Sequence, residues 1–290
     1  MLTYPDIDPI ALSIGPIAGF GPLQIHWYGL MYLVGFAAAM LLANYRAKQP
    51  GSNWNKDQVS DLIFYGAMGV ILGGRAGYVL FYNFGQFLDN PIWLFQIWTG
   101  GMSFHGGLLG VLVALWLFGR KYKKGFFEVA DFAAPLVPIG LMTGRFGNFI
   151  GGELWGRVTE GPWGMVFPGG GPDPRHPSQL YQAALEGLAL FLIVWWFSSR
   201  PRPQKAVGAV FMIGYGCFRF IVEFVRQPDS HIGFDLFGWM SRGQLLSVPM
   251  VLFGIALLWW SYKQQDQAAA IVDNTSSKVS KKTSKKHAKS

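Results

Sequence analysis

The chain has 290 residues, of which 51% are hydrophobic and only 14% are charged, whereas an ordinary soluble domain carries about a quarter charged residues. This composition excludes a typical soluble globular domain and favours a membrane protein. The net charge of +8 owes much to lysines near the C-terminus, and the single cysteine, Cys217, excludes an internal disulfide and a zinc site built from several cysteines.

Seven apolar runs approach the length of about 20 residues that an α-helix needs to cross a bilayer. The third run is the shortest. In chain order the runs cover residues 25–45, 62–82, 105–119, 129–150, 181–197, 207–224 and 245–262. The sequence therefore predicts an all-α polytopic membrane protein with about seven transmembrane helices.

Lysine and arginine are unevenly distributed over the segments that connect these runs. Seventeen of them fall in alternate segments, at 45–57, 120–124, 198–205 and 263–290. Only four fall in the other segments, which are 1–24, 83–104, 151–180 and 225–244. Because basic loops remain in the cytoplasm, we expect the N-terminus outside and the C-terminus in the cytoplasm.

Three arginines, Arg75, Arg145 and Arg219, fall within the apolar runs. A charged side chain at the bilayer centre costs about 2.5 to 3.5 kcal/mol even on the lenient insertion scale, so each needs a partner or a function. In the predicted orientation all three lie toward the outer ends of their helices, on the same side as Glu153 and Glu186. We therefore expect an outward-facing polar chamber whose natural guest is an anion.

The spacing of polar residues refines this expectation. Tyr215, Arg219 and Glu223 are four residues apart, so they share one face of the sixth helix, where Arg219 can pair with Glu223. This stripe is either part of a binding site or a self-satisfied ion pair. Arg145 and Asn148 are three residues apart at the end of the fourth helix.

Glycine has two interpretations in this sequence. In the segment Gly144–Gly156 glycines flank an arginine, an asparagine and a glutamate at the water boundary, where flexible backbone suits a phosphate-sized ligand. Glycines within the apolar runs, Gly144 included, also repeat the small-xxx-small spacing that lets helices approach closely. We interpret most of this second group as packing positions: Gly69, Gly73, Gly77, Gly106, Gly110, Gly140 and Gly144.

His105 opens the third apolar run after a glycine-containing loop. A histidine at a membrane boundary is either an amphipathic anchor or, beside arginines that favour a neutral imidazole, a general base. The residues alone leave both interpretations open.

Several motifs occur in a fixed order along the chain. The longest is Gly144–Gly156, which reads GRFGNFIGGELWG; the others are HWYGL at 26–30, GMSFHGG at 101–107, RHPSQLY at 175–181, and GYG at 214–216 followed by Arg219, Glu223 and Arg226. This set closely resembles bacterial prolipoprotein diacylglyceryl transferases. The resemblance covers nearly the whole chain except the C-terminal tail. Gly151 departs from the family signature, which usually has an asparagine there.

The resemblance implies transfer of the diacylglyceryl group of phosphatidylglycerol to the lipobox cysteine of a prolipoprotein, with formation of a thioether and release of glycerol phosphate. Arginine forks suit a phosphodiester, and the resemblance implies Arg145, assisted by Arg219, as the phosphatidylglycerol contact. It implies His105 as the candidate base, although arginine electrostatics alone could suffice. The remaining site residues that it implies are Tyr28, Asn148, Glu153, Gly156, Tyr215, Arg219 and Glu223.

The same resemblance places the protein in the bacterial cytoplasmic (inner) membrane, with its active site toward the outer leaflet. Residues 1–263 then form a seven-helix transmembrane catalytic domain with a periplasmic N-terminus and a periplasmic loop region at 151–180. Residues 264–290 form a disordered, lysine-rich cytoplasmic tail, which we expect to rest on anionic lipid rather than to bind nucleic acid. The expected partners are phosphatidylglycerol, the signal peptide and lipobox of prolipoproteins, and membrane lipids.

Two other classes of protein compete with this interpretation. An anionic-lipid flippase or transporter would also use intramembrane arginines, and Glu128 and Asp131 at the inner end of the fourth helix hint at an inner polar path. Transporters usually show internal repeats, which this sequence does not clearly show. A non-catalytic receptor for exported peptides is the other alternative. The sequence contains no metal-ligand cluster or nucleotide loop, so we expect no cofactor.

Overall fold

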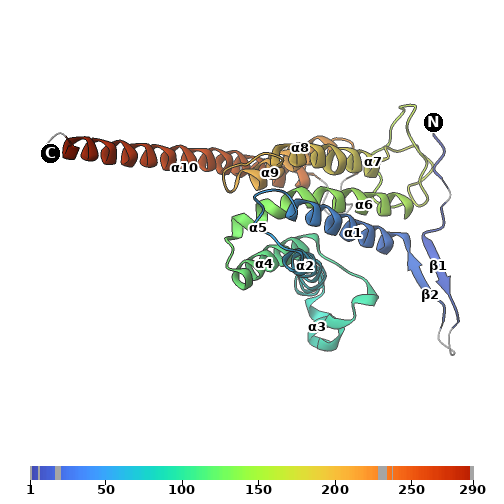
Figure 1. Cartoon of the computed structure of the whole chain (residues 1–290). Coiled ribbons are helices and arrows are strands. Elements are labelled where there is room, and N and C mark those ends of the chain that lie inside the picture. The colour runs from blue at the N-terminus through green and yellow to red at the C-terminus, as the bar shows by residue number, and fades with distance from the viewer. Residues whose placement is uncertain (1, 6, 17–20, 228–233, 237, 288–290) are drawn as a thin grey trace.

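A computed structural model describes residues 2–5, 7–16, 21–227, 234–236 and 238–287, and it is dominated by long helices (Figure 1). Within these residues two short antiparallel sheets lie outside the helices, with β1 paired to β2 and β3 paired to β4. The elements in chain order are β1 Ile10–Ile14, β2 Leu23–His26, α1 Trp27–Ala47, α2 Lys56–Tyr82, α3 Phe84–Asp89, η1 Pro91–Phe95, η2 Ile97–Thr99, α4 Phe104–Tyr122, α5 Phe126–Ala133, η3 Ala134–Leu136, α6 Val137–Ile150, α7 Ser178–Gln182, η4 Ala183–Ala189, α8 Leu190–Ser198, α9 Ala206–Val222, β3 Phe234–Leu236, β4 Met240–Ser241 and α10 Arg242–His287.

Each of the seven predicted apolar runs coincides with a helical segment. Five of these segments are long and apolar enough to cross a membrane: Trp27–Ala47, Lys56–Tyr82, Phe126–Ile150, Ser178–Ser198 and Arg242–Gln267. The other two are α4, with 19 residues, and α9, a shorter apolar helix of 17 residues. Large apolar side chains such as Leu41, Phe64 and Trp196 remain exposed on the helix surfaces, as expected for faces that contact lipid. The chain is therefore a multi-pass helical membrane protein, and the count of seven crossings stays a prediction.

The helices pack as neighbouring groups. Figure 1 shows α6 between α1 on one side and the continuous helix of α7, η4 and α8 on the other. The pair α9 and α10 packs beside the α7–α8 helix, and the pair α2 and α4 lies beyond α1. Helix α6 thus lies at the centre of the bundle, with its C-terminal end directed toward the loop that precedes α7.

The predicted glycine packing is confirmed between α2 and α4. A Cβ atom added at Gly73 would lie 2.4 Å from the carbonyl oxygen of Gly106, and one added at Gly110 would lie 2.0 Å from the carbonyl oxygen of Gly69. The two backbones therefore touch, which only glycine permits. At Gly140 and Gly144 an added Cβ meets no atom within 4 Å, so these two positions tolerate a methyl group, although a Cβ added at Gly35 of α1 would lie 3.2 Å from Gly140 Cα.

We expect Gly110→Ala to destabilise the fold by about 1 to 3 kcal/mol or more, because the contact between α2 and α4 has no room for the added methyl group. Gly144→Ala is the matched control, since its methyl group enters open space. Thermal unfolding of the purified variants in detergent measures the difference. Equal melting temperatures for the two variants would contradict the close contact between α2 and α4.

Helix α10 continues to His287 and so includes most of the segment 264–290 for which we predicted disorder. The part of this segment nearest the bundle contains glutamine and alanine, which are good helix formers, and this accounts for the helical backbone there. The side chains beyond residue 267 and all of residues 288–290 lie outside the described residues. The lipid-binding role of the tail stays a prediction.

Candidate active site

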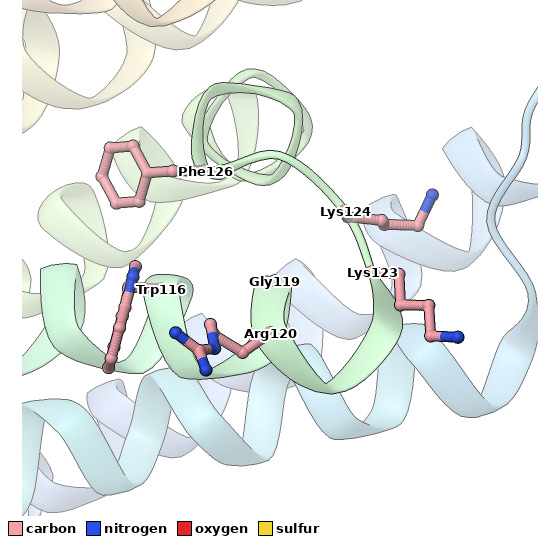
Figure 2. Close-up of a pocket in the computed structure, with 6 residues that line it drawn as sticks. All are labelled: Trp116, Gly119, Arg120, Lys123, Lys124 and Phe126. Carbon is pink, nitrogen blue, oxygen red and sulfur yellow. The ribbon is translucent and has the colours of Figure 1, made fainter.

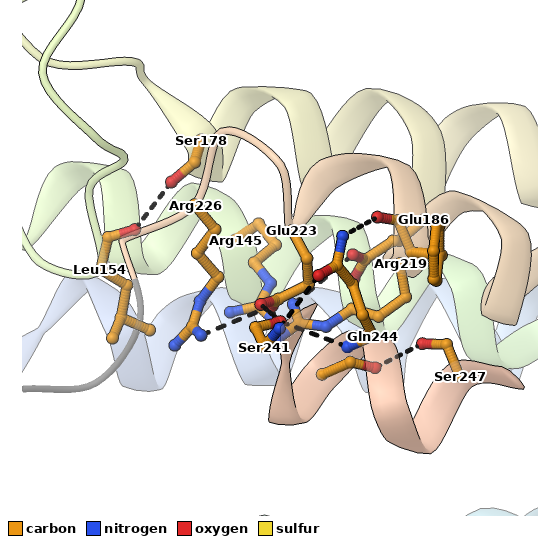
Figure 3. Close-up of polar contacts among 12 residues, drawn as sticks. Arg145, Leu154, Ser178, Glu186, Arg219, Glu223, Arg226, Ser241, Gln244 and Ser247 are labelled. Atoms are coloured by element: carbon orange, nitrogen blue, oxygen red, sulfur yellow. Dashed lines mark hydrogen bonds and ion pairs between the residues drawn. The ribbon is translucent and has the colours of Figure 1, made fainter. Parts of the chain in front are cut away.

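Glu223, at the C-terminal end of α9, is the centre of a buried ionic cluster (Figure 3). Its side chain is 1% exposed and its Oε1 lies 2.6 Å from Arg219 Nη2 and 3.5 Å from Arg226 Nη1. The hydroxyl of Ser241 donates to Glu223 Oε2 at 2.6 Å. The predicted pairing of Arg219 with Glu223 is confirmed, and it is one part of a larger cluster.

A second carboxylate reaches the same cluster from η4. Glu186 is completely buried, and its Oε1 lies 3.6 Å from Arg219 Nη1. Tyr215 lies one turn before Arg219 on α9 and interacts electrostatically with Glu186 and Arg219. Tyr215 and Arg219 therefore lie toward Glu186 on the α7–α8 helix, whereas Glu223 contacts Ser241 at the start of α10.

Arg145 approaches the cluster from α6 and begins a chain of polar contacts. Its Nη1 donates to Asn148 Oδ1 at 3.3 Å, and Asn148 Nδ2 donates to Glu153 Oε1 at 2.8 Å. Figure 3 shows Arg145 beside the cluster of Arg219 and Glu223, and its charge interacts with those of Glu186 and Arg219. Within the described part of the chain Arg145 forms no ion pair with a carboxylate, so its charge is the least neutralised in the cluster.

Gly156 joins the loop after α6 to the end of α9. Its N–H donates to the carbonyl oxygen of His176 at 2.8 Å. The N–H of the next residue, Arg157, donates to the carbonyl oxygen of Val225 at 2.8 Å. An added Cβ at Gly156 would lie 2.5 Å from the carbonyl oxygen of Val225. The structure therefore assigns Gly156 a packing role that holds the polar residues of α6 and α9 together.

His176 is part of the folded loop between α6 and α7. Its Nδ1 accepts a hydrogen bond from Trp163 Nε1 at 3.4 Å and lies 3.3 Å from the hydroxyl of Tyr181. Partial burial lowers the pKa of His176 from its ordinary value. The neutral ring, which can accept these hydrogen bonds, is therefore the form that the fold stabilises.

This lowered pKa predicts a loop that loosens in acid. His176 binds a proton more readily in the unfolded chain than in the folded loop. The contribution of neutral His176 to the stability of the loop is therefore fully present above the ordinary histidine pKa of about 6.5. This contribution is lost as the pH falls through the lower pKa that His176 has in the folded loop. We expect weaker hydrogen-exchange protection of the Met165 and Arg175 amides at pH 5 than at pH 7.5, after correction for intrinsic rates. His176→Gln, which does not titrate, should lack this difference; the same pH dependence in that variant would contradict the assignment.

Two predicted residues, Arg75 and His105, lie apart from the ionic cluster. Arg75 is buried and donates to the carbonyl oxygens of Leu94 at 3.1 Å and Trp93 at 2.6 Å, and also to that of Gly100. Our expectation that Arg75 joins the polar chamber is therefore wrong: its hydrogen bonds organise the segment before α4. His105 is exposed on α4, which packs against α2 and α5, and the described contacts do not bring it to Arg145.

Tyr28 lies on α1, the neighbour of α6. Its hydroxyl is 3.1 Å from that of Tyr32, and its ring packs where Gly147 leaves room, since a Cβ at Gly147 would lie 2.9 Å from Tyr28 Cδ2. Tyr28 therefore borders the Arg145 end of the site rather than the Glu223 end.

A cavity of about 420 Å³ lies at the opposite end of α4 from His105 (Figure 2). It is lined by Trp116, Gly119, Arg120, Lys123, Lys124 and Phe126. None of these residues belongs to the ionic cluster, and Lys124 is already paired with Glu128 at 2.7 Å. The basic residues of this lining belong to the segment 120–124, which the sequence analysis predicts to be cytoplasmic, so we do not place the reaction there.

Sequence reasoning missed several buried polar residues beside the cluster. Gln182 is 1% exposed, while Ser241 and Gln244 are 2% and 0% exposed. The spacing of Gln179, Gln182 and Glu186 by three and four residues was the available signal, because it aligns polar groups on one face of an otherwise apolar helix.

The fold and this cluster define a multi-pass membrane protein with a buried, arginine-rich polar site. Residues 16–260 match the family model described as prolipoprotein diacylglyceryl transferase. The chain is 62% identical over 269 residues to the phosphatidylglycerol–prolipoprotein diacylglyceryl transferase of Photobacterium profundum, covering 92% of this chain and 98% of that protein. It is 58% identical over 267 residues to the enzyme of the same name from Coxiella burnetii, covering 92% of this chain and 100% of that protein. The chain belongs to the prolipoprotein diacylglyceryl transferase family.

Proposed function

We propose that this chain transfers the diacylglyceryl group of phosphatidylglycerol to the lipobox cysteine of prolipoproteins, the first step of bacterial lipoprotein maturation. The cysteine sulfur attacks the glyceryl carbon that carries the phosphate. The new C–S bond is a thioether, the C–O bond to phosphate breaks, and glycerol phosphate leaves with that electron pair. The thiol proton passes to a base or to the departing phosphate.

The observation that carries this proposal is the incomplete neutralisation of Arg145 next to Arg219. Arg219 is held in place by Glu186 and Glu223, whereas Arg145 contacts only the neutral amide of Asn148 among the described hydrogen-bond partners. An anionic phosphodiester is the group that an arginine fork binds best. In a water-poor site the same two guanidinium groups stabilise the charge that develops on the leaving phosphate.

The remaining site residues support this geometry. Asn148 and Glu153 orient the Arg145 side chain. Tyr28 on α1 lies on one side of Arg145, and Tyr215 on α9 lies on the other. Gly156 keeps the loop after α6 against α9. His105 stays our candidate base, and since it lies on α4, this role requires the thiol to reach from the Arg145 cluster toward α4. A base that removes the proton of a thiol with an ordinary pKa near 8.5 raises the fraction of reactive thiolate.

We further propose seven crossings with a periplasmic N-terminus and the site toward the outer leaflet of the inner membrane. The distribution of lysine and arginine supports this orientation. Glu153 is exposed at the end of α6, so the polar chain that starts at Arg145 reaches the bundle surface there. Both substrates are anchored in the membrane, and we infer that lipid and signal peptide enter sideways between helices.

The contacts of Asp131 and Glu128 argue against the flippase alternative. Asp131 accepts hydrogen bonds from the N–H groups of Lys205 at 2.6 Å and Gly208 at 2.8 Å, so it caps the N-terminus of α9. Glu128 pairs with Lys124 and accepts a hydrogen bond from Asn53 at 2.9 Å. Both carboxylates have structural partners, so their presence near the inner end of the fourth predicted helix does not require a polar path for a transported lipid.

The test uses the purified full chain with acyl-labelled phosphatidylglycerol and a signal peptide that contains a lipobox. We expect labelled thioether on the peptide and an equal amount of glycerol phosphate, with no product from a peptide whose cysteine is replaced by serine. Movement of the lipid between leaflets without product would support the flippase instead.

The same assay tests the base. We expect His105→Gln to lose about 10²-fold or more in kcat, since general base catalysis typically contributes 10² to 10⁴. Residual turnover above roughly a tenth of wild type would remove His105 from this role.

A further inference from the structure

Three polar residues face the interior from one side of the α7–η4 helix. Gln179, Gln182 and Glu186 are 0%, 1% and 0% exposed, although their helix is otherwise apolar enough to cross a membrane. The spacing by three residues in α7 and by four through the π-helical turns of η4 keeps all three on one face. π-Helical turns occur frequently at functional sites.

The hydrogen-bonding capacity of this face is largely unused. Gln179 Nε2 donates to the carbonyl oxygen of Glu153 at 2.6 Å, but Gln179 Oε1 has no hydrogen-bond partner among the described residues. Both amide atoms of Gln182 lack a partner in the same part of the chain. A buried, unpaired amide destabilises a fold, and leucine would fill the same volume without that cost. The glutamine therefore suggests a ligand that carries its own donors and acceptors.

The two flanking residues locate the Gln182 amide. On one side Gln179 contacts Glu153, which is bound to Asn148 and so to Arg145. On the other side Glu186 pairs with Arg219. Gln182 lies between them in the helix and is buried like them, so we infer that its amide faces the interior between the Glu153 contact and the Arg219 contact of this helix.

We propose that the amide of Gln182, together with Oε1 of Gln179, binds the hydroxyl groups of the glycerol headgroup of phosphatidylglycerol and makes Gln182 a specificity-determining residue. This inference rests on the proposed function. The headgroup carries two neighbouring hydroxyls, each a donor and an acceptor, and a carboxamide offers one acceptor and two donors. With the phosphate on Arg145 and Arg219, these hydroxyls are a few bonds away and reach the adjacent amides.

The probe is phosphatidylpropanol, which has the same phosphodiester and acyl chains but lacks both headgroup hydroxyls. It undergoes the same transfer and releases propyl phosphate. A site built to bind hydroxyl groups discriminates against such an analogue because its buried polar groups are left unpaired. We expect wild type to use phosphatidylglycerol with a kcat/KM about 10- to 100-fold above that for phosphatidylpropanol.

Gln182→Leu should lower kcat/KM for phosphatidylglycerol by about this factor and so bring the two lipids to similar values. Its melting temperature should not fall, because the variant removes an unpaired buried group. Gln86→Leu, at an exposed position on α3, is the control and should keep the wild-type preference.

The outcomes are distinguishable. Wild-type transfer with equal kcat/KM for the two lipids would overturn the headgroup assignment and leave the transferase proposal intact. A Gln182→Leu variant that melts lower and keeps the preference would show a structural role only and would also overturn it. Absence of transfer from either lipid would overturn both proposals.

Discussion

Arg145→Ala is expected to reduce the transfer rate by about 10² to 10³, the loss typical of removing one preorganised group that stabilises developing negative charge. Among the described residues Arg145 is the arginine of the cluster that forms no ion pair with a carboxylate, so its charge is available to the lipid phosphate. Arg145→Lys should recover only part of the activity, because an ammonium group is a point charge and cannot form a two-pronged contact with a phosphodiester. Initial rates of labelled thioether formation at saturating peptide measure both variants.

Two comparisons separate this catalytic effect from a structural one. Arg120→Ala removes an exposed arginine at the opposite end of the bundle and should keep wild-type activity. Arg145→Ala should melt close to wild type, since the substitution leaves no carboxylate without its only cation. Activity of Arg145→Ala within twofold of wild type would exclude the phosphate contact.

The helices and the Arg219–Glu223 pair were predictable because both follow from distances along the chain. An apolar run of sufficient length predicts a membrane crossing. Residues four apart on a helix are neighbours, independently of the other helices around them. The close contact of α2 and α4 also followed from spacing, because glycines at every fourth position form a continuous groove.

The prediction for Arg75 was wrong because the sequence indicates how deep a residue lies in the membrane but not which helices its side chain faces. The prediction put Arg75 at the same level as Arg145 and Arg219, but a level does not say which neighbours a side chain faces. In the structure Arg75 turns toward the backbone of Trp93 and Leu94. The same limit applies to His105, whose helix packs against α2.

Gln182 was missed for a different reason. A charged group within the membrane is costly and therefore indicates a functional role, whereas an uncharged amide in an apolar run costs less and gives a weaker indication. The π-helical turns of η4, which keep Glu186 in line with Gln182, have no simple sequence signature.

Arg219→Gln is expected to destabilise the protein by about 3 to 5 kcal/mol, the usual cost of removing one partner from a buried ion pair. The substitution leaves Glu186, which is fully buried and whose described ion pair is with Arg219, without a compensating charge. Glu223 is affected less, because Arg226 and Ser241 still contact it. The expected result is a clear fall in the apparent melting temperature of the purified protein.

The double variant Arg219→Gln/Glu186→Gln tests this explanation, because it removes the stranded carboxylate together with its partner. Neighbours in one ionic network couple by about 0.5 to 3 kcal/mol, so the double variant should melt above the single Arg219→Gln variant. Both variants should remain inactive, since neither has the Arg219 guanidinium at the phosphate site. A double variant that melts lower than the single one would mean that Glu186 stabilises the fold independently of Arg219, and the ionic cluster would then require a different explanation. If stability recovers and activity does not, Arg219 serves two separate functions: it neutralises Glu186 in the folded bundle, and it holds the lipid phosphate during transfer.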